Sequence, residues 1–269
     1  TEIHSQKSRR KAPFLEQSTP RDSQMTPART LETLVPRGLE AFRDRNYLAS
    51  GLAHHINNPL ATIRTFLQLL PTHYEDPEFR EKYLATALSE SERIRDLVKD
   101  IMRATTVPVE GREVQELDDI LARAEDGVAS AMQAKRVVCR KNMAMGLPPV
   151  RVHGEAATCL FVTLLQNAVR FSDDGAAIEI NSEMDEQSHR VVTTIRDYGP
   201  GISPEHREKI FEPFFTTAVD GLGMGLFVAS RIADLQDITL TFENREPSGV
   251  AFTVALPVAE PETAAVQER

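Results

Sequence analysis

The stretch that decides the fold reads Ala53-His54-His55-Ile56-Asn57-Asn58-Pro59-Leu60. Apolar residues recur through it at spacings of four, four, three, four and three, which is typical of the packed seam of a helical bundle. The seam residues are Leu52, Ile56, Leu60, Ile63, Leu67 and Leu70. At about 100° per residue, His54 lies roughly 170° from the centre of this seam, and Asn58 shares its face. We therefore expect the imidazole of His54 to face solvent.

Two neighbours of His54 lie on other faces of the same helix. His55 is roughly 90° from the seam. Because adjacent helical residues diverge by about 100°, His54 and His55 are not expected to chelate one metal ion. Pro59 lacks a backbone donor and clashes with the preceding turn, so a kink is expected directly beneath His54.

Helical periodicity continues on both sides of this stretch and indicates an antiparallel hairpin. One helix is expected from about Pro36 to Leu70, a proline-punctuated loop over 71–77, and a second helix over 78–105. The seam of the second helix contains Leu84, Ala87 or Leu88, Ser91, Ile94, Leu97 or Val98, and Ile101. Since a hairpin supplies only one partner face, a second copy would bury the rest most simply, as a two-fold symmetric four-helix bundle. We therefore expect a homodimer.

The composition is that of an ordinary soluble protein and argues against several function classes. Of the 269 residues, 41% are hydrophobic and 6% aromatic, without Trp, so a large aromatic ligand surface is not expected. The net charge of −9 and the lack of a base-reading motif work against nucleic-acid binding. Cys139 and Cys159 have neither the number nor the spacing of a metal site and are expected to be reduced core thiols.

The sequence also bears on location. No apolar run approaches the roughly 20 residues that span a bilayer, so no membrane segment is expected in this chain. The chain begins with Thr1 instead of Met, which suggests excision from a longer protein. We expect a cytoplasmic location, and the full-length protein could be membrane-anchored through a missing N-terminal part.

Four segments are expected along the chain: a flexible arm over 1–30, the hairpin over 31–107, a second domain over 113–258 and a disordered tail over 259–269. In the second domain, strands separated by turns and helices in groups predict an α+β sandwich, with a mixed sheet covered on one face by helices. Its helices are expected near 117–134, 155–171 and 223–235, with a short one after 203. Its strands are expected near 137–142, 150–152, 177–184, 190–196, 239–243 and 250–256.

One helix of the second domain presents polar side chains that suit a magnesium nucleotide. Leu160, Leu164 and Phe171 occupy one side of the helix expected over 155–171. Asn167 and Arg170 can therefore project together from another side. A neutral amide oxygen suits Mg²⁺ that already has phosphate ligands, because this ion keeps oxygen ligands and seldom needs a full protein cage.

Two glycine-rich segments follow. Asp197-Tyr198-Gly199-Pro200-Gly201-Ile202 comes after a strand, where the carboxylate could accept a hydrogen bond from an exocyclic amine and the glycines let the backbone approach a flat ring. Alone, this segment could equally be a Gly-Pro turn with a capping Asp. Gly221-Leu222-Gly223-Met224-Gly225-Leu226 opens a helix, where exposed N–H groups favour phosphate. Its spacing is not that of a dinucleotide fingerprint.

Together these segments resemble the sequence boxes of the sensor histidine kinases of two-component signalling. Residues 53–60 are similar to the H-box, 164–172 to the N-box, 197–202 to the G1 box, 210–217 to the F-box and 221–226 to the G2 box. The resemblance covers roughly 48–256. It implies a dimerisation and histidine-phosphotransfer hairpin followed by a GHKL-type ATP-binding catalytic domain. The nucleotide-binding residues that it implies, with Mg²⁺ on Asn167, are Asn167, Arg170, Asp197, Gly199, Gly201, Phe215, Thr216, Thr217, Gly221, Gly223, Gly225 and Leu226.

Three positions depart from the pattern of that family. His55 replaces the acidic residue that usually follows the phosphoacceptor, and Thr163 stands where many members have an Asn. Ala218 replaces a common Lys and begins a very short lid over 218–220. We expect His55 to act as a candidate base, with slower autophosphorylation and a steeper loss of activity below about pH 6.5.

The resemblance implies an ATP-dependent protein-histidine kinase. Such an enzyme would autophosphorylate His54 and pass the phosphoryl group to an Asp of a response-regulator receiver domain. Asn58 matches the position where relatives hold the water that dephosphorylates the regulator, so phosphatase activity is a second expectation. Two alternatives stay open. One is a degenerate kinase that acts as a scaffold or phosphotransfer module with weak ATP turnover, and the other is a gyrase-like ATPase, which would leave the histidine hairpin without a role.

Overall fold

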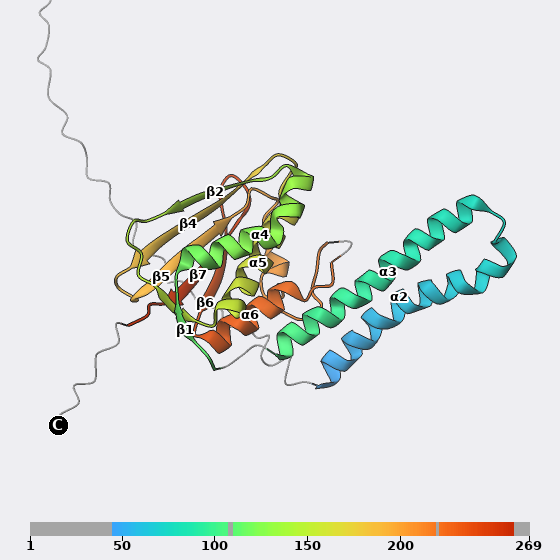
Figure 1. Cartoon of the computed structure of the whole chain (residues 1–269), viewed down its shortest axis with the longest axis horizontal. Coiled ribbons are helices and arrows are strands. Elements are labelled where there is room, and N and C mark those ends of the chain that lie inside the picture. The colour runs from blue at the N-terminus through green and yellow to red at the C-terminus, as the bar shows by residue number, and fades with distance from the viewer. Residues whose placement is uncertain (1–44, 107–109, 219–220, 261–269) are drawn as a thin grey trace, which may run out of the picture. The chain divides into compact units, whose positions relative to one another are not determined.

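The computed structural model describes residues 45–106, 110–218 and 221–260 (Figure 1). Several expectations from the sequence lie outside these residues. They are the flexible arm, the first part of the hairpin over 31–44, the junction between the hairpin and the second domain over 107–109, two lid residues over 219–220 and most of the tail over 261–269.

The hairpin consists of α2 (Arg45–His73) and α3 (Pro77–Thr105). α3 begins at Pro77 because the Asp76 carboxylate caps it, accepting hydrogen bonds from the N–H groups of Glu78 (3.0 Å) and Phe79 (3.2 Å). The loop expected over 71–77 is wrong, because α2 continues through Pro71 and leaves only 74–76 between the helices. Pro71 removes one hydrogen bond from the helix, but on an exposed turn water can replace it.

The inner side of the hairpin is formed around a residue that the expected seam omitted. Phe66 is 7% exposed, and its ring stacks on those of Phe79 (5.9 Å between centroids) and Tyr83 (6.3 Å). Several of the expected seam residues instead remain largely exposed in the single chain. These are Leu60 (47%), Leu67 (58%) and Leu84 (52%). Two residues that were each one of a pair of alternatives are also exposed, Leu88 (59%) and Val98 (44%), but Leu97, the alternative to Val98, is completely buried. The hairpin therefore has an apolar face beyond the one that its own two helices bury.

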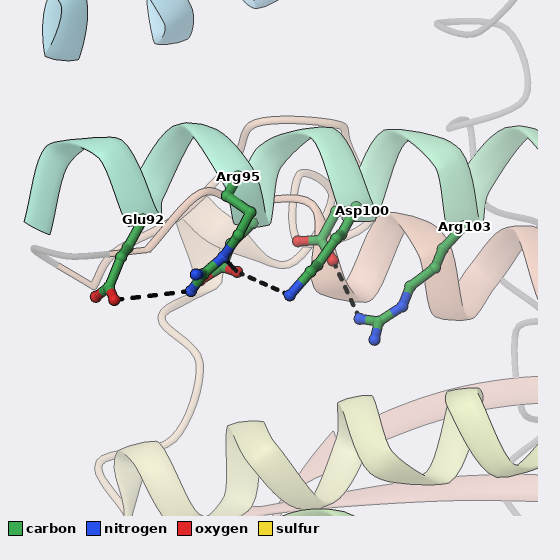
Figure 2. A network of polar contacts seen from close by, with 6 residues as sticks. Glu92, Arg95, Asp100 and Arg103 are labelled. Carbon is green, nitrogen blue, oxygen red and sulfur yellow. Dashed lines mark hydrogen bonds and ion pairs between the residues drawn. The ribbon is translucent and has the colours of Figure 1, made fainter. Parts of the chain in front are cut away.

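The surface of α3 carries a row of ion pairs between residues close in sequence (Figure 2). Arg95 lies 3.8 Å from Glu92, and Arg103 lies 3.4 Å from Asp100. Because pairs of this kind are solvent-screened, each contributes only about 0.2–0.5 kcal/mol to the helix.

The globular domain contains a five-stranded mixed sheet in the order β2-β4-β5-β7-β6. β2 and β4 are parallel, and the other neighbours are antiparallel. The strands are β2 (Val138–Met143), β4 (Ala177–Asp185), β5 (Arg190–Arg196), β6 (Thr239–Asn244) and β7 (Val250–Pro257). A separate antiparallel pair joins β1 (Glu113–Gln115), which the sequence did not predict, to β3 (Val150–Val152).

Three helices cover one face of this sheet (Figure 1). They are α4 (Leu117–Lys135), α5 (Gly154–Phe171) and α6 (Gly225–Gln236), and a 3₁₀ turn, η1 (Pro204–His206), follows Ser203. Burial alternates along β5, where Val191, Thr193 and Ile195 face the helices. A sheet with one covered face explains this alternation and confirms the expected α+β sandwich. Within the described ranges, none of the helices has the length and apolar character to cross a membrane.

Candidate functional site

His54 lies on the exposed side of α2, as the helical periodicity predicted. Its Nε2 atom lies 3.1 Å from Nδ2 of Asn58, one turn further along the helix and also exposed. An amide nitrogen can only donate, so this contact uses the lone pair of Nε2. The ring nitrogen is thus accessible from solvent and held by one neighbouring side chain.

His55 lies at the flank of the helix and is partly covered. Its ring is perpendicular to that of His54 at a centroid distance of 5.7 Å and stacks on Phe214 at 5.1 Å. A Cβ atom on Gly51, one turn before, would lie 2.5 Å from the same Phe214 ring, so a larger residue there would have to displace that ring. Desolvation by burial lowers the pKa of His55, and the electrostatic effects of the neighbouring His54 and Arg93 act in the same direction. His55 therefore stays neutral below the pH at which a free imidazole becomes charged.

Asn167 and Arg170 project from α5 on the side away from the core, as expected. Leu160 and Leu164 are completely buried, whereas Asn167 is partly exposed and Arg170 is exposed. Phe171 was expected on the apolar side but is 38% exposed, because it is the last residue of the helix. Asn167 offers the neutral oxygen that a phosphate-bound Mg²⁺ accepts.

Thr163, at the position of a second Asn in many relatives, is buried and contributes packing instead. Its hydroxyl donates to the carbonyl of Cys159 at 2.9 Å. Its Cγ2 atom would lie 3.2 Å from a Cβ on Gly225, the first residue of α6. Thr163 therefore sets the approach of α5 to the glycine-rich segment.

Asp197 follows β5 and is buried, with 6% of its surface exposed. Its Oδ1 atom accepts hydrogen bonds from the N–H groups of Gly199 (2.9 Å) and Val250 (3.2 Å). Burial raises the pKa of this carboxyl, and the two N–H groups oppose that rise. Both of these bonds go to Oδ1, so Oδ2 can accept from a ligand amine.

The segment after Asp197 is held by two residues that sequence reasoning missed. The Asn244 side chain accepts from the N–H of Ile202 (2.9 Å) and donates to its carbonyl (2.8 Å), as a paired strand would. Gly249 has φ +97°, and a Cβ there would overlap the carbonyl of Asp197. The sequence held a signal for Gly249, because this glycine stands directly before the strand expected over 250–256. It held no comparable signal for Asn244.

The F-box and the G2 box come together with the N-box helix. A Cβ on Gly221 would overlap Oγ1 of Thr216 and would lie 3.1 Å from Nη1 of Arg170. Gly223 has φ +69°, and its missing side chain leaves room for the carbonyl of Phe214. Residues of the N-box, the F-box and the G2 box therefore lie close together around Gly221.

The remaining residues implied by the resemblance lie around the same region. Thr216 and Thr217 are exposed, Phe215 packs edge-on against His206 at 5.3 Å, and Gly225 opens α6 with Leu226 beside it. α6 begins two residues later than expected, and its cap residue, Met224, offers no side-chain acceptor. The first N–H groups of α6 can therefore bind an anion.

This arrangement fits an adenine nucleotide. Asp197 supplies a buried acceptor for an exocyclic amine, the glycines allow close backbone approach, and the start of α6 with Arg170 favours phosphate. In the part of the chain that is described, no cluster of three or more His, Cys, Asp or Glu side chains could hold a metal ion. A cation there would rely on phosphate oxygens and Asn167, as Mg²⁺ commonly does.

The cysteines take no part in this site. Cys139 and Cys159 are free and half-buried, and desolvation raises the pKa of Cys139 to about 11. A thiol with such a pKa stays protonated at neutral pH. Both cysteines are free, as expected, but they pack against the edge of the core and are not enclosed in it.

Comparison with known families matches both parts of the chain. Residues 44–106 match the His Kinase A (phospho-acceptor) domain. Residues 157–260 match the histidine kinase-, DNA gyrase B- and HSP90-like ATPase family. The first match gives the hairpin a role that the gyrase-like alternative lacked.

Curated relatives match most of this chain within longer chains of their own. The chain is 26% identical over 213 residues to Sporulation kinase E of Bacillus subtilis, covering 79% of this chain and 28% of that protein. It is 27% identical over 216 residues to the sensor histidine kinase ZraS of Salmonella typhimurium, covering 79% and 45%. The chain thus spans less than half the length of these two relatives.

Solved structures share the architecture. Histidine kinase ThkA, in a complex with the response regulator protein TrrA, aligns with a TM-score of 0.65 and 25% identity over 82% of this chain and 66% of that one. Histidine kinase AdeS of Acinetobacter baumannii aligns with a TM-score of 0.59 and 20% identity over 77% of this chain and 98% of that one. The second likeness concerns the fold alone.

Proposed function

We propose, from the premise that this chain belongs to the sensor histidine kinases, that it transfers the γ-phosphoryl group of ATP to His54. The observation that carries the proposal is the pairing of an exposed imidazole on α2 with a globular domain whose Asp197, Arg170 and glycine segments suit an adenine nucleotide. A chain that only relayed phosphate would not need the second part. The degenerate-scaffold alternative is therefore the weaker one.

Each residue of the globular site has a distinct role in this reaction. Asp197 accepts from the adenine amine, and the N–H groups at the start of α6, with Arg170, bind the phosphates. Asn167 contributes a ligand to Mg²⁺, which when bound neutralises charge on the phosphates. Catalysis then comes mainly from positioning, because phosphoryl transfer asks for little covalent chemistry from the protein.

His54 is the nucleophile. The lone pair of a neutral ring nitrogen forms the N–P bond, and the bond from the γ-phosphorus to the bridging oxygen breaks, with its electron pair leaving on ADP. The proton on the other ring nitrogen of His54 is then released to a base. His55, neutral and adjacent, is the candidate acceptor for that proton, although it cannot offer the negative charge of the usual acid.

The phosphoryl group would next pass to an aspartate of a response-regulator receiver domain. The support is the exposure of His54 and Asn58 on one face, together with the ThkA structure, which contains a regulator. Asn58, with its amide one turn from His54, is the candidate residue for dephosphorylating that regulator. We expect Asn58→Ala to lengthen the lifetime of the phosphorylated regulator, and an unchanged lifetime would remove this second activity.

We also propose that the active form is a homodimer that acts in the cytoplasm, where ATP is available. The apolar side chains Leu60, Leu67, Leu84 and Leu88 remain exposed in the single chain. A second hairpin packed on them would complete a four-helix bundle.

The decisive experiment is incubation with γ-labelled ATP and Mg²⁺. The wild-type chain should take up label that is acid-labile and alkali-stable, as expected of a phosphohistidine, and His54→Ala should take up none. Thr65→Ala, exposed about three turns further along the same face and not in contact with His54, is the control for a change of surface. Label that persists in His54→Ala would refute the proposal, and nucleotide binding without any labelling would favour the scaffold alternative.

A further inference from the structure

Lys135, in the last turn of α4, is bonded to the end of the N-box helix α5. Its ammonium nitrogen lies 3.2 Å from the carbonyl of Val169, 2.8 Å from that of Arg170 and 2.9 Å from that of Ser172. These three carbonyls match the three donors of an ammonium group. The carbonyl of Lys135 in turn accepts from the N–H of Gly175 at 2.8 Å. The turn after α5 is thus attached to α4 from both directions.

Three of the last four carbonyls of α5 accept hydrogen bonds. That of Ala168 accepts from the N–H (3.1 Å) and the hydroxyl (2.6 Å) of Ser172. Those of Val169 and Arg170 accept from Lys135. The end of a helix carries partial negative charge, so a cation there satisfies both the hydrogen bonds and the dipole.

The fourth carbonyl connects this helix end to the G1 box. A Cβ on Gly199 would lie 2.6 Å from the carbonyl oxygen of Phe171, so the G1 segment lies directly on the end of α5. Arg170 is one of the residues that Lys135 holds, and its guanidinium reaches the region of Gly221. A shift of this helix end would therefore move Arg170 and displace the segment that follows Asp197.

We infer that Lys135 is a positioning residue for the nucleotide site. By binding the carbonyls of Val169, Arg170 and Ser172, it sets the places of Arg170 and of the G1 segment, and through them the affinity for the nucleotide. The inference rests on the proposed adenine-nucleotide site. Lys135 itself would not touch the nucleotide.

A helix cap that acts only on stability is the competing explanation, and the chain offers a matched control for it. Arg190 donates to the carbonyls of Asp237 (2.6 Å) and Ala255 (3.2 Å) and to the carboxylate of Asp237 (3.1 Å). It therefore fixes the C-terminal end of α6, whose nucleotide-binding end is about 18 Å away for a helix of 12 residues. Lys135 and Arg190 make similar bonds, but only Lys135 makes them beside the site.

The test compares the whole chain with its Lys135→Met, Lys135→Arg and Arg190→Met variants, by calorimetric ADP binding in the presence of Mg²⁺ and by thermal unfolding. Lys135→Met should weaken ADP binding about tenfold, while Arg190→Met should stay within about twofold even though both lower the melting temperature. The ADP affinity of Lys135→Arg should lie between those of Lys135→Met and the wild type. A planar guanidinium cannot direct its donors at the same three carbonyls as an ammonium group does.

Unchanged ADP binding by Lys135→Met, or equal weakening by Arg190→Met, would overturn the role of Lys135. If Lys135→Met does not fold, Lys135→Arg decides, and wild-type affinity in that variant refutes the inference. A wild-type chain that binds no ADP would refute the proposed function itself, and the role of Lys135 with it. The two failures are therefore distinguishable.

Discussion

The hairpin and the globular domain bury their apolar side chains to very different extents. In the globular domain Phe161, Leu164 and Ile180 are completely enclosed within one chain. In the hairpin Leu67 and Leu88 remain 58% and 59% exposed. A domain that closes its own core can build a binding site alone, whereas a hairpin with an open apolar face depends on a second surface.

The polar side chains of the two regions also differ in how firmly their neighbours hold them. Asp197 is fixed by two backbone N–H groups, and the neighbouring Ile202 is fixed by both ends of the Asn244 side chain. His54 has one side-chain contact, to Asn58, on an exposed face. A rigid set of donors and acceptors suits a single ligand bound in one pose. A lightly held imidazole suits the proposed function, in which His54 would meet ATP first and a regulator later.

The largest effect is expected from opening the core of the globular domain. Phe161→Ala should cost about 3–5 kcal/mol in the free energy of unfolding, because it leaves a cavity among side chains that cannot collapse into it. Chemical denaturation of the whole chain, followed at several protein concentrations, measures this. The loss should be independent of concentration, since one chain forms that core; a concentration-dependent loss would contradict the self-contained domain.

A smaller but concentration-dependent effect is expected on the hairpin. Leu67→Glu places a charge on the exposed apolar face and should shift the chain from dimer to monomer, which sedimentation velocity would detect. Gln68→Glu, the next residue along, adds the same charge on a different face of the helix and serves as the control. Equal behaviour of the two variants, or a wild-type chain that is monomeric at all concentrations, would show that this face does not bind a second copy.

Asp197→Asn should separate stability from binding within the rigid site. The amide oxygen of the variant can still accept from the N–H groups of Gly199 and Val250. Its NH₂ group, however, donates, so it cannot accept from the adenine amine. ADP binding should therefore weaken about 10- to 100-fold, the range for losing a hydrogen bond to a charged group. Because burial raises the pKa of Asp197, its charged form costs stability as the pH rises through that pKa. Thermal unfolding at neutral pH should thus show Asp197→Asn to be no less stable than the wild type.

The pH dependence of wild-type binding follows from the same shift. As the pH falls, Asp197 takes up its proton above the usual range of an aspartate and loses its acceptor character. ADP affinity should therefore begin to fall at a higher pH than for an ordinary aspartate. An affinity that is flat down to pH 4 would contradict a role for the carboxylate.

The two regions also differ in what their sequence could predict. The globular elements follow directly from periodicity and glycine spacing, and every expected strand and helix is present within two residues. β1 was missed because three residues with no buried side chain carry no alternation. Lys135 and Asn244 were missed because their partners are backbone groups distant in sequence, and no local pattern records such a partner.

In the hairpin, the periodicity predicted the exposure of His54 but not the packing. Phe66 was missed because the three- and four-residue spacing of the seam selected its neighbour Leu67. The ring of Phe66 is instead the one that reaches the partner helix, where it stacks on Phe79. The helix also continues past Pro71, where a proline was expected to end it. The division at residues 31, 107 and 113, the kink at Pro59 and the roles of the individual site residues stay predictions.

A modest effect is expected from His55, where the two regions touch. The lowered pKa of this imidazole means that the folded chain resists its protonation, so stability linked to it is present above about pH 6.5 and is lost as the pH falls from there to the folded-state pKa. The loss of activity expected below about pH 6.5 should accordingly begin at a lower pH. His55→Glu should raise the autophosphorylation rate and, as a permanent charge, flatten its dependence on pH; an unchanged rate and profile would exclude His55 as the base.

The smallest effect is expected on the surface of α3, where charges are paired without being buried. Glu92→Gln removes the partner of Arg95, but both side chains are more than half exposed, and Arg95 keeps Asp96 at 3.7 Å. The free energy of unfolding should change by less than about 0.5 kcal/mol, and less still in 1 M salt, which screens such pairs. Denaturation of Glu92→Gln beside Leu67→Glu at low and high salt measures this. A large, salt-sensitive loss in Glu92→Gln would mean that this charged row, and not the apolar face, stabilises the hairpin.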